Sequence, residues 1–343
     1  MTKLLQYLLP AAAVLCVTGC AQSNTSSTGQ LAQEYVQLWL DKYYNGVQPD
    51  QWGVCILEDT PGTGALWDSE ITYSYLTSTI RTLEGTVTSN TDEKWAKQLG
   101  TYQQGNYYGP KYHATGAGSG YAGTEYMLQG MRVGGTRTAL IPAWLLTNNR
   151  YNTLQEYLDN CPGSTHYLYT LKLEGQCQDI LQEEKDSLRS YVTRHYGADV
   201  QSCTYKGEDG IFYFISDSTA FAGVEQRSAT ATLKLDYSGY LLNGQLFDTT
   251  ILQDALDSGM YQEGSTPEPV SITFSSTITS IAMDNSTSLI EGFQAGLYKM
   301  HWAGQKATIL FVSNLGYSTS GNGDVIPSYS PLLFKLELLE EEE

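Results

Sequence analysis

The sequence predicts an α+β protein built from two similar units, each an antiparallel sheet with one short helix late in the unit. A helix pattern followed by a short apolar strand occurs twice, and the two copies lie about 160 residues apart. Short runs of alternating apolar and polar residues dominate both copies. The 343 residues are enough to bury two hydrophobic cores.

Each unit is predicted to begin with an amphipathic helix that precedes its first strand. In the first unit the helix pattern comes before the strand 53–57, and it consists of Leu31, Tyr35, Leu38 and Trp39. In the second unit the pattern comes before the strand 210–215, and it consists of Ile180, Leu181, Leu188, Tyr191 and Val192. The repeated order predicts that both units share one fold.

The second unit shows the clearer strand pattern, with apolar residues alternating over 231–237, 307–311 and 332–338. Asn243-Gly244 predicts a type I′ hairpin turn. A short helix is predicted from an apolar stripe that needs a sheet to cover it, formed by Ile290, Phe293, Leu297 and Met300. The Gly, Ser and Asn content of the loop 318–327 predicts that it is exposed.

Four segments of the second unit resemble the FKBP-type peptidyl-prolyl cis-trans isomerase family. They are LDYSGYLLNGQLFDTT (235–250), LIEGFQAGLYKMHWAGQKATILFV (289–312), LGYSTSGNGDVIP (315–327) and LLFKLELL (332–339). Together they cover nearly all of 228–340 in the family's order. The resemblance implies a bent antiparallel sheet wrapped on a short helix, and isomerisation of X-Pro bonds without a cofactor or a metal.

The resemblance also implies which residues form the proline pocket. The catalytic set would be Tyr237, Phe247, Asp248, Ile290 and Tyr317. The substrate-binding set would be Val270, Leu289, Phe293, Ile326 and Phe334. Phe293 stands where the family usually has a Trp floor, and Val270 stands where an aromatic residue is common, so we expect a weaker grip there. The partners would be proline-containing segments of unfolded or exported proteins.

The first unit resembles a degenerate copy of the same family, through GVCILEDTPGTG (53–64) and GTEYMLQGMRVGGTRTALIP (123–142). Its pocket residues differ, because Thr88 and Ser89 replace the Phe-Asp pair and Thr124 takes the floor position. We therefore expect the fold to be kept and isomerisation to be lost. A peptide groove lined by Tyr112, Trp144 and Tyr169, or core packing of the same residues, explains these aromatics equally well.

The first residues predict export. Lys3 precedes the apolar run LLQYLLPAAAVLCV, which is shaped like a signal peptide, and Val17-Thr18-Gly19-Cys20 resembles the lipobox of bacterial lipoproteins. We expect a protein of the bacterial cell envelope, lipid-anchored at Cys20 on the periplasmic face of the outer membrane. The predicted segments are a signal peptide (1–19), a lipidated tether (20–30), a degenerate domain (31–176), a helical linker (177–204) and an isomerase domain (205–343).

Charge and residue spacing argue against other functions. The net charge of −18 repels phosphate, so nucleic acid is an unfavourable partner. The four His are scattered and no Cys spacing is typical of a metal site. The remaining thiols allow three disulfide pairings, which the sequence leaves open, among Cys55, Cys161, Cys177 and Cys203.

Three functions remain open from the sequence. The first is a prolyl isomerase that assists folding of exported proteins. The second is a non-catalytic chaperone in which both domains hold unfolded segments. The third is glycan binding at the surface, through the abundant Tyr and Trp.

Overall fold

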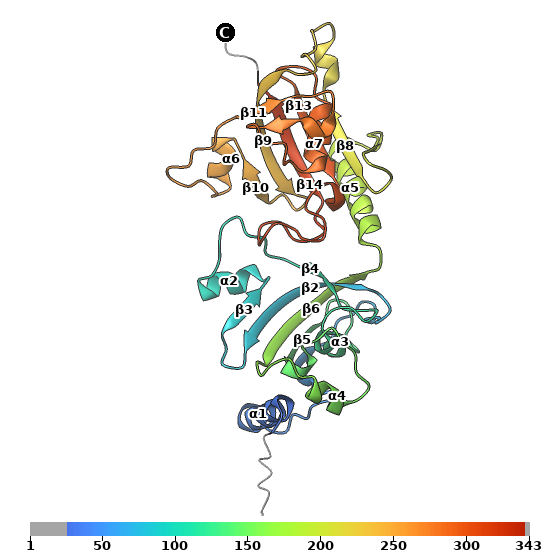
Figure 1. The fold of residues 1–343 in the computed structure, drawn as a ribbon, viewed down its shortest axis with the longest axis vertical. Helices are drawn as coiled ribbons and strands as arrows, with labels where there is room; N and C mark the ends of the chain where they lie inside the picture. The colour runs from blue at the N-terminus through green and yellow to red at the C-terminus, as the bar shows by residue number, and fades with distance from the viewer. Residues whose placement is uncertain (1–25, 340–343) are drawn as a thin grey trace, which may run out of the picture.

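Two antiparallel sheets form the body of the protein in a computed structural model that describes residues 26–339 (Figure 1). The prediction of an α+β fold with two antiparallel units is confirmed. The predicted signal peptide and Cys20 lie outside the described residues. Within 26–339, no helix is long and apolar enough to cross a bilayer.

The first sheet has six strands in the order β1-β5-β6-β2-β3, with β4 also paired to β2. Its strands are β1 (Cys55–Thr60), β2 (Tyr73–Thr82), β3 (Val87–Asn90), β4 (Lys111–Ala114), β5 (Thr136–Ile141) and β6 (Tyr167–Cys177). The helices of this unit are α1 (Thr28–Tyr43), α2 (Glu93–Leu99), α3 (Ala122–Leu128), the 3-10 turn η1 (Ala143–Leu145) and α4 (Leu154–Asp159).

The second sheet has eight strands in the order β12-β11-β9-β14-β13-β8-β7, with β10 also paired to β9. Its strands are β7 (Cys203–Thr204), β8 (Ile211–Ser216), β9 (Thr232–Leu241), β10 (Leu246–Thr249), β11 (Val270–Thr273), β12 (Ala282–Met283), β13 (Lys306–Phe311) and β14 (Leu332–Leu338). The helices are α5 (Ile180–Tyr196), α6 (Leu252–Asp257) and α7 (Glu291–Tyr298), with the 3-10 turns η2 (Ser218–Phe221), η3 (Ile278–Ser280) and η4 (Ser313–Leu315).

The two sheets repeat one arrangement around a long central strand. β2 pairs with β6 on one side, and on the other side β4 covers its first half and β3 its second half. β9 pairs in the same way with β14, and then with β11 and β10. Even a side-chain contact recurs, because the Ser78 N–H donates to Thr91 Oγ1 over 2.9 Å and the Tyr237 N–H donates to Thr250 Oγ1 over 2.8 Å.

Glycines let the short helix of each unit approach its sheet closely. A Cβ atom at Gly292 of α7 would lie 2.4 Å from the Phe311 ring of β13. In the first unit, a Cβ atom at Gly123 of α3 would lie 2.4 Å from Ile141 of β5. Glycine inside a helix costs about 1 kcal/mol relative to alanine. The tight contact with the sheet, rather than helix propensity, therefore accounts for glycine at these positions.

Two local predictions for the second unit are wrong. A type I′ turn needs positive φ at both central residues, but only Gly244 has it, with φ 90°. The Leu241 N–H donates instead to Gln245 O, which closes a three-residue hairpin loop. The loop 318–327 is not fully exposed, because Ile326 is only 1% exposed.

The four cysteines within residues 26–339 are free thiols. Cys55 and Cys177 are buried, and Cys161 and Cys203 are half-buried. Burial, followed by the charge of Asp50, raises the pKa of Cys55 to about 12. A thiol with so high a pKa stays protonated at neutral pH and is a poor nucleophile.

We expect Gly292→Ala to lower the free energy of unfolding by about 1–3 kcal/mol, because the added methyl group overlaps the buried Phe311 ring. Gly163→Ala is the control, since nothing lies within 4 Å of its Cβ position. Urea denaturation of both variants measures the effect. Stabilisation by Gly292→Ala, as helix propensity alone would give, would show that the helix does not contact the sheet this closely.

Candidate functional site

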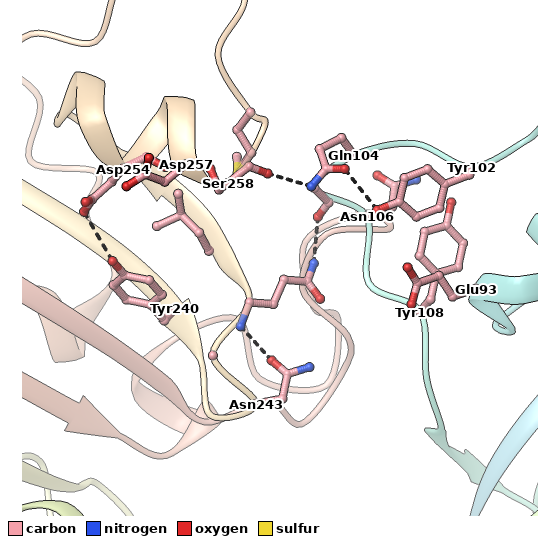
Figure 2. A pocket seen from close by; sticks show the side chains of 15 residues that line it. Glu93, Tyr102, Gln104, Asn106, Tyr108, Tyr240, Asn243, Asp254, Asp257 and Ser258 are labelled. Atoms are coloured by element: carbon pink, nitrogen blue, oxygen red, sulfur yellow. Dashed lines mark hydrogen bonds between the residues drawn. The ribbon is translucent and has the colours of Figure 1, made fainter. Parts of the chain in front are cut away.

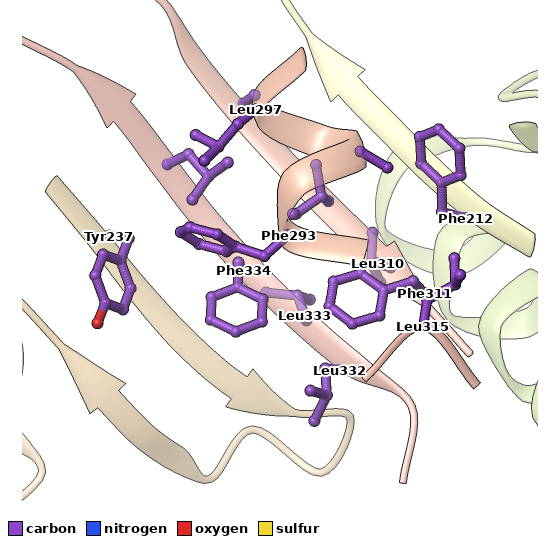
Figure 3. Close-up of a cluster of buried hydrophobic side chains, with 14 of the residues drawn as sticks. Phe212, Tyr237, Phe293, Leu297, Leu310, Phe311, Leu315, Leu332, Leu333 and Phe334 are labelled. Carbon is purple, nitrogen blue, oxygen red and sulfur yellow. The ribbon is translucent and has the colours of Figure 1, made fainter. Parts of the chain in front are cut away.

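Four aromatic rings of the second unit meet where α7 packs on the sheet, and Figure 3 shows three of them, Tyr237, Phe293 and Phe334. Phe334 of β14 is central, with its ring centroid 5.0 Å from Phe293 of α7 and 5.4 Å from Phe247 of β10. Tyr237 of β9 lies 5.5 Å from Phe293. The planes of these pairs are inclined by 66° to 85°, the edge-to-face geometry that aromatic rings favour. We call Tyr237, Phe247, Phe293 and Phe334 the aromatic floor.

The backbone under the aromatic floor is shaped to admit the rings. A Cβ atom at Gly239 of β9 would lie 2.6 Å from Phe247 and 2.8 Å from Phe334, so glycine leaves the space that both rings fill. The pairing of β10 with β9 shifts register between Leu246 and Asp248. Such bulges re-aim side chains. Here Phe247 is buried and Asp248 is exposed.

A hydrogen bond fixes the acidic side chain at the edge of the floor. The Tyr237 hydroxyl donates to Asp248 Oδ2 over 2.7 Å. Burial and then the negative charge of Asp248 raise the pKa of Tyr237, so its proton stays in place across the physiological range. Asp248 is therefore held as an acceptor beside an apolar surface.

The other predicted residues surround the floor. Ile290 directly precedes α7, and its backbone N–H donates to no acceptor within residues 26–339. Tyr317 is half-buried in the loop after η4, and burial followed by the charge of Asp248 raises its pKa. Ile326 is part of the same hydrophobic cluster as the floor, and Val270 and Leu289 pack against it. Nine of the ten predicted residues thus belong to this cluster or pack against it, and the tenth, Asp248, is bonded to Tyr237.

The floor is well packed. Tyr237 and Phe247 are 8% and 9% exposed, and Phe293 and Phe334 are both 4% exposed. A bound side chain would therefore rest on ring edges rather than sink into a deep hollow. The polar groups around those edges are the Asp248 carboxylate, the Ile290 N–H and the Tyr317 hydroxyl.

The first unit has a cavity where the second has its floor. Strand pairing places Ser78, Thr88 and Tyr169 at the positions of Tyr237, Phe247 and Phe334. Thr124 takes the position of Phe293, because each follows the helix glycine that packs on the sheet. With three rings gone, a cavity of about 300 Å³ is lined by Ser78, Thr124 and Tyr169 among others. The smaller side chains leave this space unfilled.

The three aromatics expected in a groove of the first unit do not line one together. Trp144 is buried, and its Nε1–H donates to Trp52 O over 2.8 Å. Tyr112 packs against Tyr329 of the second unit, with ring centroids 6.3 Å apart. Tyr169 alone lines the cavity of the first unit. Core packing and a contact between the units account for the other two.

Residues 223–339 match the family model described as FKBP-type peptidyl-prolyl cis-trans isomerase. This segment belongs to that family. FK506-binding protein 2 of Dictyostelium discoideum is 32% identical to the chain over 107 residues, which are 31% of this chain and 62% of that protein. The chain thus spans less than two thirds of this curated relative. The FKBP-type segment contains six of the eight strands of the second sheet, β9 to β14, and the whole aromatic floor.

Several solved structures also show similarity, with low TM-scores. A peptidyl-prolyl isomerase from Pseudomonas syringae is 18% identical, with TM-score 0.30, and the match covers 48% of this chain and 94% of that chain. FkpA from Escherichia coli is 20% identical, with TM-score 0.28 and coverages of 47% and 62%. The three FKBP domains of wheat FKBP73 are 12% identical, with TM-score 0.27 and coverages of 84% and 94%.

We expect Tyr237→Phe to lower the free energy of unfolding by about 1 kcal/mol at pH 7, because the hydrogen bond to Asp248 is lost. The folded-state pKa of Tyr237 is raised, so the contribution is complete below the ordinary tyrosine pKa of about 10 and declines at higher pH. Denaturation from pH 7 to 11 measures the difference between the two proteins. A difference that grows above pH 10 would contradict the assigned hydrogen bond.

Proposed function

We propose that the second unit catalyses cis-trans isomerisation of X-Pro bonds in polypeptides. The observation that carries this proposal is the Asp248 carboxylate held by Tyr237 at the edge of the aromatic floor, within an FKBP-type segment. The apolar rings suit a pyrrolidine ring. The free N–H of Ile290 suits a substrate carbonyl.

Isomerisation needs a strained amide rather than covalent chemistry. Rotation about the X-Pro bond meets a barrier of about 18–20 kcal/mol, because amide resonance is lost in the twisted state. The planar amide is more polar than the twisted one, so a surface that excludes water disfavours the planar form. Contacts that strengthen only in the twisted state accelerate the reaction. The aromatic floor would exclude water and so disfavour the planar amide.

The polar groups around the floor would supply the contacts that strengthen in the twisted state. The Ile290 N–H, which precedes α7, would hold a carbonyl of the bound peptide, and Asp248 would face the amide as it twists. The Tyr317 hydroxyl is close enough to Asp248 for that charge to raise its pKa, and it would hold a second carbonyl. Each 1.4 kcal/mol of preference for the twisted state gives about a tenfold rate increase, so a few such contacts suffice.

We expect Phe247→Ala to lower kcat/KM for a proline tetrapeptide about a hundredfold, because it removes one ring of the aromatic floor. We expect Asp248→Asn to lower it about tenfold, because it removes the carboxylate charge. Asp257→Asn on α6 is the matched control, because this exposed carboxylate accepts only from Gln253. A coupled-protease assay on the full chain gives the rates. Wild-type rates in the Phe247→Ala variant would exclude the aromatic floor as the site.

A second candidate function is peptide holding without catalysis. The 300 Å³ cavity of the first unit favours it, because this cavity lacks both the floor and the acid yet opens at the equivalent place. A chaperone role would leave suppression of client aggregation unchanged in a Phe247→Ala, Asp248→Asn double variant. An isomerase role in folding would lose its effect on proline-limited refolding in the same variant.

We further propose that exported proteins are the substrates and that Cys20 anchors the chain to the envelope membrane. The lipobox-like Val17-Thr18-Gly19-Cys20 supports the anchor. α1, the helix farthest from the second unit in Figure 1, also has an exposed stripe formed by Leu31, Tyr35 and Leu38. Residues this apolar on a surface helix suit a membrane interface close to the anchor.

We expect Cys20→Ser to move the protein from the membrane to the soluble fraction and to abolish palmitate incorporation. The reason is that serine has no thiol to carry the lipid. Cell fractionation and labelling of cells with radioactive palmitate measure both effects. Cys55→Ser is the control, because Cys55 is buried in the first unit. Unchanged labelling of Cys20→Ser would exclude the anchor.

A further inference from the structure

The loop that carries Tyr317 and Ile326 is held from outside the second sheet. It connects β13 to β14 and includes η4, and we call residues 313–331 the site loop. In Figure 1 this red segment lies between the second sheet and the first unit. Its length and its Gly, Ser and Asn content would leave such a loop mobile if it had no outside contacts.

Glu184 of α5 anchors the beginning of the site loop. The Ser313 N–H donates to Glu184 Oε2 and the Ser313 hydroxyl to Glu184 Oε1, each over 2.6 Å. Glu184 is 4% exposed, and its burial raises its pKa. The equivalent donor in the first unit, the Ala143 N–H, is bound within that unit by His166 Nδ1 at 3.1 Å. The second unit instead takes its anchor from the helix that joins the units.

The first unit contacts the other end of the site loop. The Tyr107 N–H donates to Asp324 O over 2.7 Å. The Tyr329 ring packs edge-on against Tyr73 of β2, with centroids 5.6 Å apart, and against Tyr112 of β4 at 6.3 Å. These contacts join two strands and a loop of the first unit to residues 324–329 of the site loop.

The same stretch of the first unit reaches the hairpin that carries Phe247 and Asp248 (Figure 2). Gln245 Nε2 donates to Gly105 O over 2.9 Å, and Gln104 Nε2 donates to Ser258 O over 2.6 Å. A cavity of about 520 Å³ lies beside these bonds. Two walls of the candidate site are therefore tied to one neighbouring segment.

The backbone of the site loop needs such support. Ser318 and Tyr329 both have positive φ, 50° and 59°, and the Tyr329 N–H donates to Ser318 O over 2.8 Å. Residues other than glycine in the left-handed region cost about 1 kcal/mol or more each, and they persist only where neighbouring contacts fix them. The Glu184 contact holds the loop just before Ser318, and the Tyr73 and Tyr112 rings hold Tyr329 itself.

We propose that Glu184 is a positioning residue for Tyr317, and that α5 and the first unit together hold the site loop in the conformation that isomerisation requires. This inference rests on the proposed function of the second unit. It gives the first unit a role that does not require a pocket of its own. Small displacements far from the reacting atoms are enough to lower a rate strongly.

The test uses the full chain with Glu184→Ala, Glu184→Gln and the matched control Glu183→Ala, whose side chain is exposed on the same helix. We expect Glu184→Ala to lower kcat/KM for a proline tetrapeptide about tenfold and to speed amide hydrogen exchange over 313–330. Glu184→Gln should recover most of the activity, because its amide oxygen still accepts from the Ser313 N–H. Glu183→Ala should match the wild type.

Wild-type activity and exchange in a folded Glu184→Ala variant would overturn the proposal. If that variant does not fold, Tyr329→Ala, which removes the aromatic contact with the first unit, takes its place, and an unchanged rate and unchanged exchange overturn the proposal equally. If the wild type shows no isomerisation, the proposed function fails. Hydrogen exchange alone then decides whether Glu184 holds the loop.

Discussion

The contact between a short helix and the face of its sheet determines how much room the rest of each unit has. Gly292 against Phe311 and Gly123 against Ile141 let the helix approach the sheet so closely in both units that an added Cβ atom would overlap the sheet side chain. Because the backbones are fixed this closely, the side chain that follows the packed glycine decides whether the space between the helix and the sheet is filled. That residue is 293 in α7 and 124 in α3.

The two units fill this space differently. In the second unit Phe293 completes an aromatic floor with Tyr237, Phe247 and Phe334, and Gly239 leaves room beneath it. In the first unit Thr124 leaves a cavity. One backbone arrangement therefore presents a firm apolar surface with an acid at its edge in one copy, and an open space without that acid in the other.

The sequence predicted those features that depend on local patterns. Alternation and helical spacing located β9, β13, β14 and α7. The family resemblance named ten residues, of which nine lie in or against the hydrophobic cluster of the second unit and the tenth, Asp248, is bonded to Tyr237. The type I′ turn predicted at Asn243-Gly244 was wrong, because the same dipeptide fits a three-residue loop in which only Gly244 is left-handed. Periodicity could not indicate the Glu184 contact, because its partner Ser313 lies 129 residues away.

The burial of Ile326 is equally hidden from composition, which describes the site loop as flexible and polar. Ile326 packs into the hydrophobic cluster of the second unit, and contacts with α5 and with the first unit hold other parts of the loop. Such contacts between units depend on shape and on backbone groups, such as the Tyr107 N–H and Asp324 O, which every residue type carries. They leave no signal in a single sequence.

Exchange NMR on a proline peptide mixed with the full chain tests the central claim most directly. Uncatalysed X-Pro isomerisation takes tens to hundreds of seconds. We predict exchange cross-peaks between the cis and trans proline signals within a mixing time of about one second, together with a shift of the Ile290 amide on titration. A shifted Ile290 amide without cross-peaks would show a site that binds proline segments and does not isomerise them.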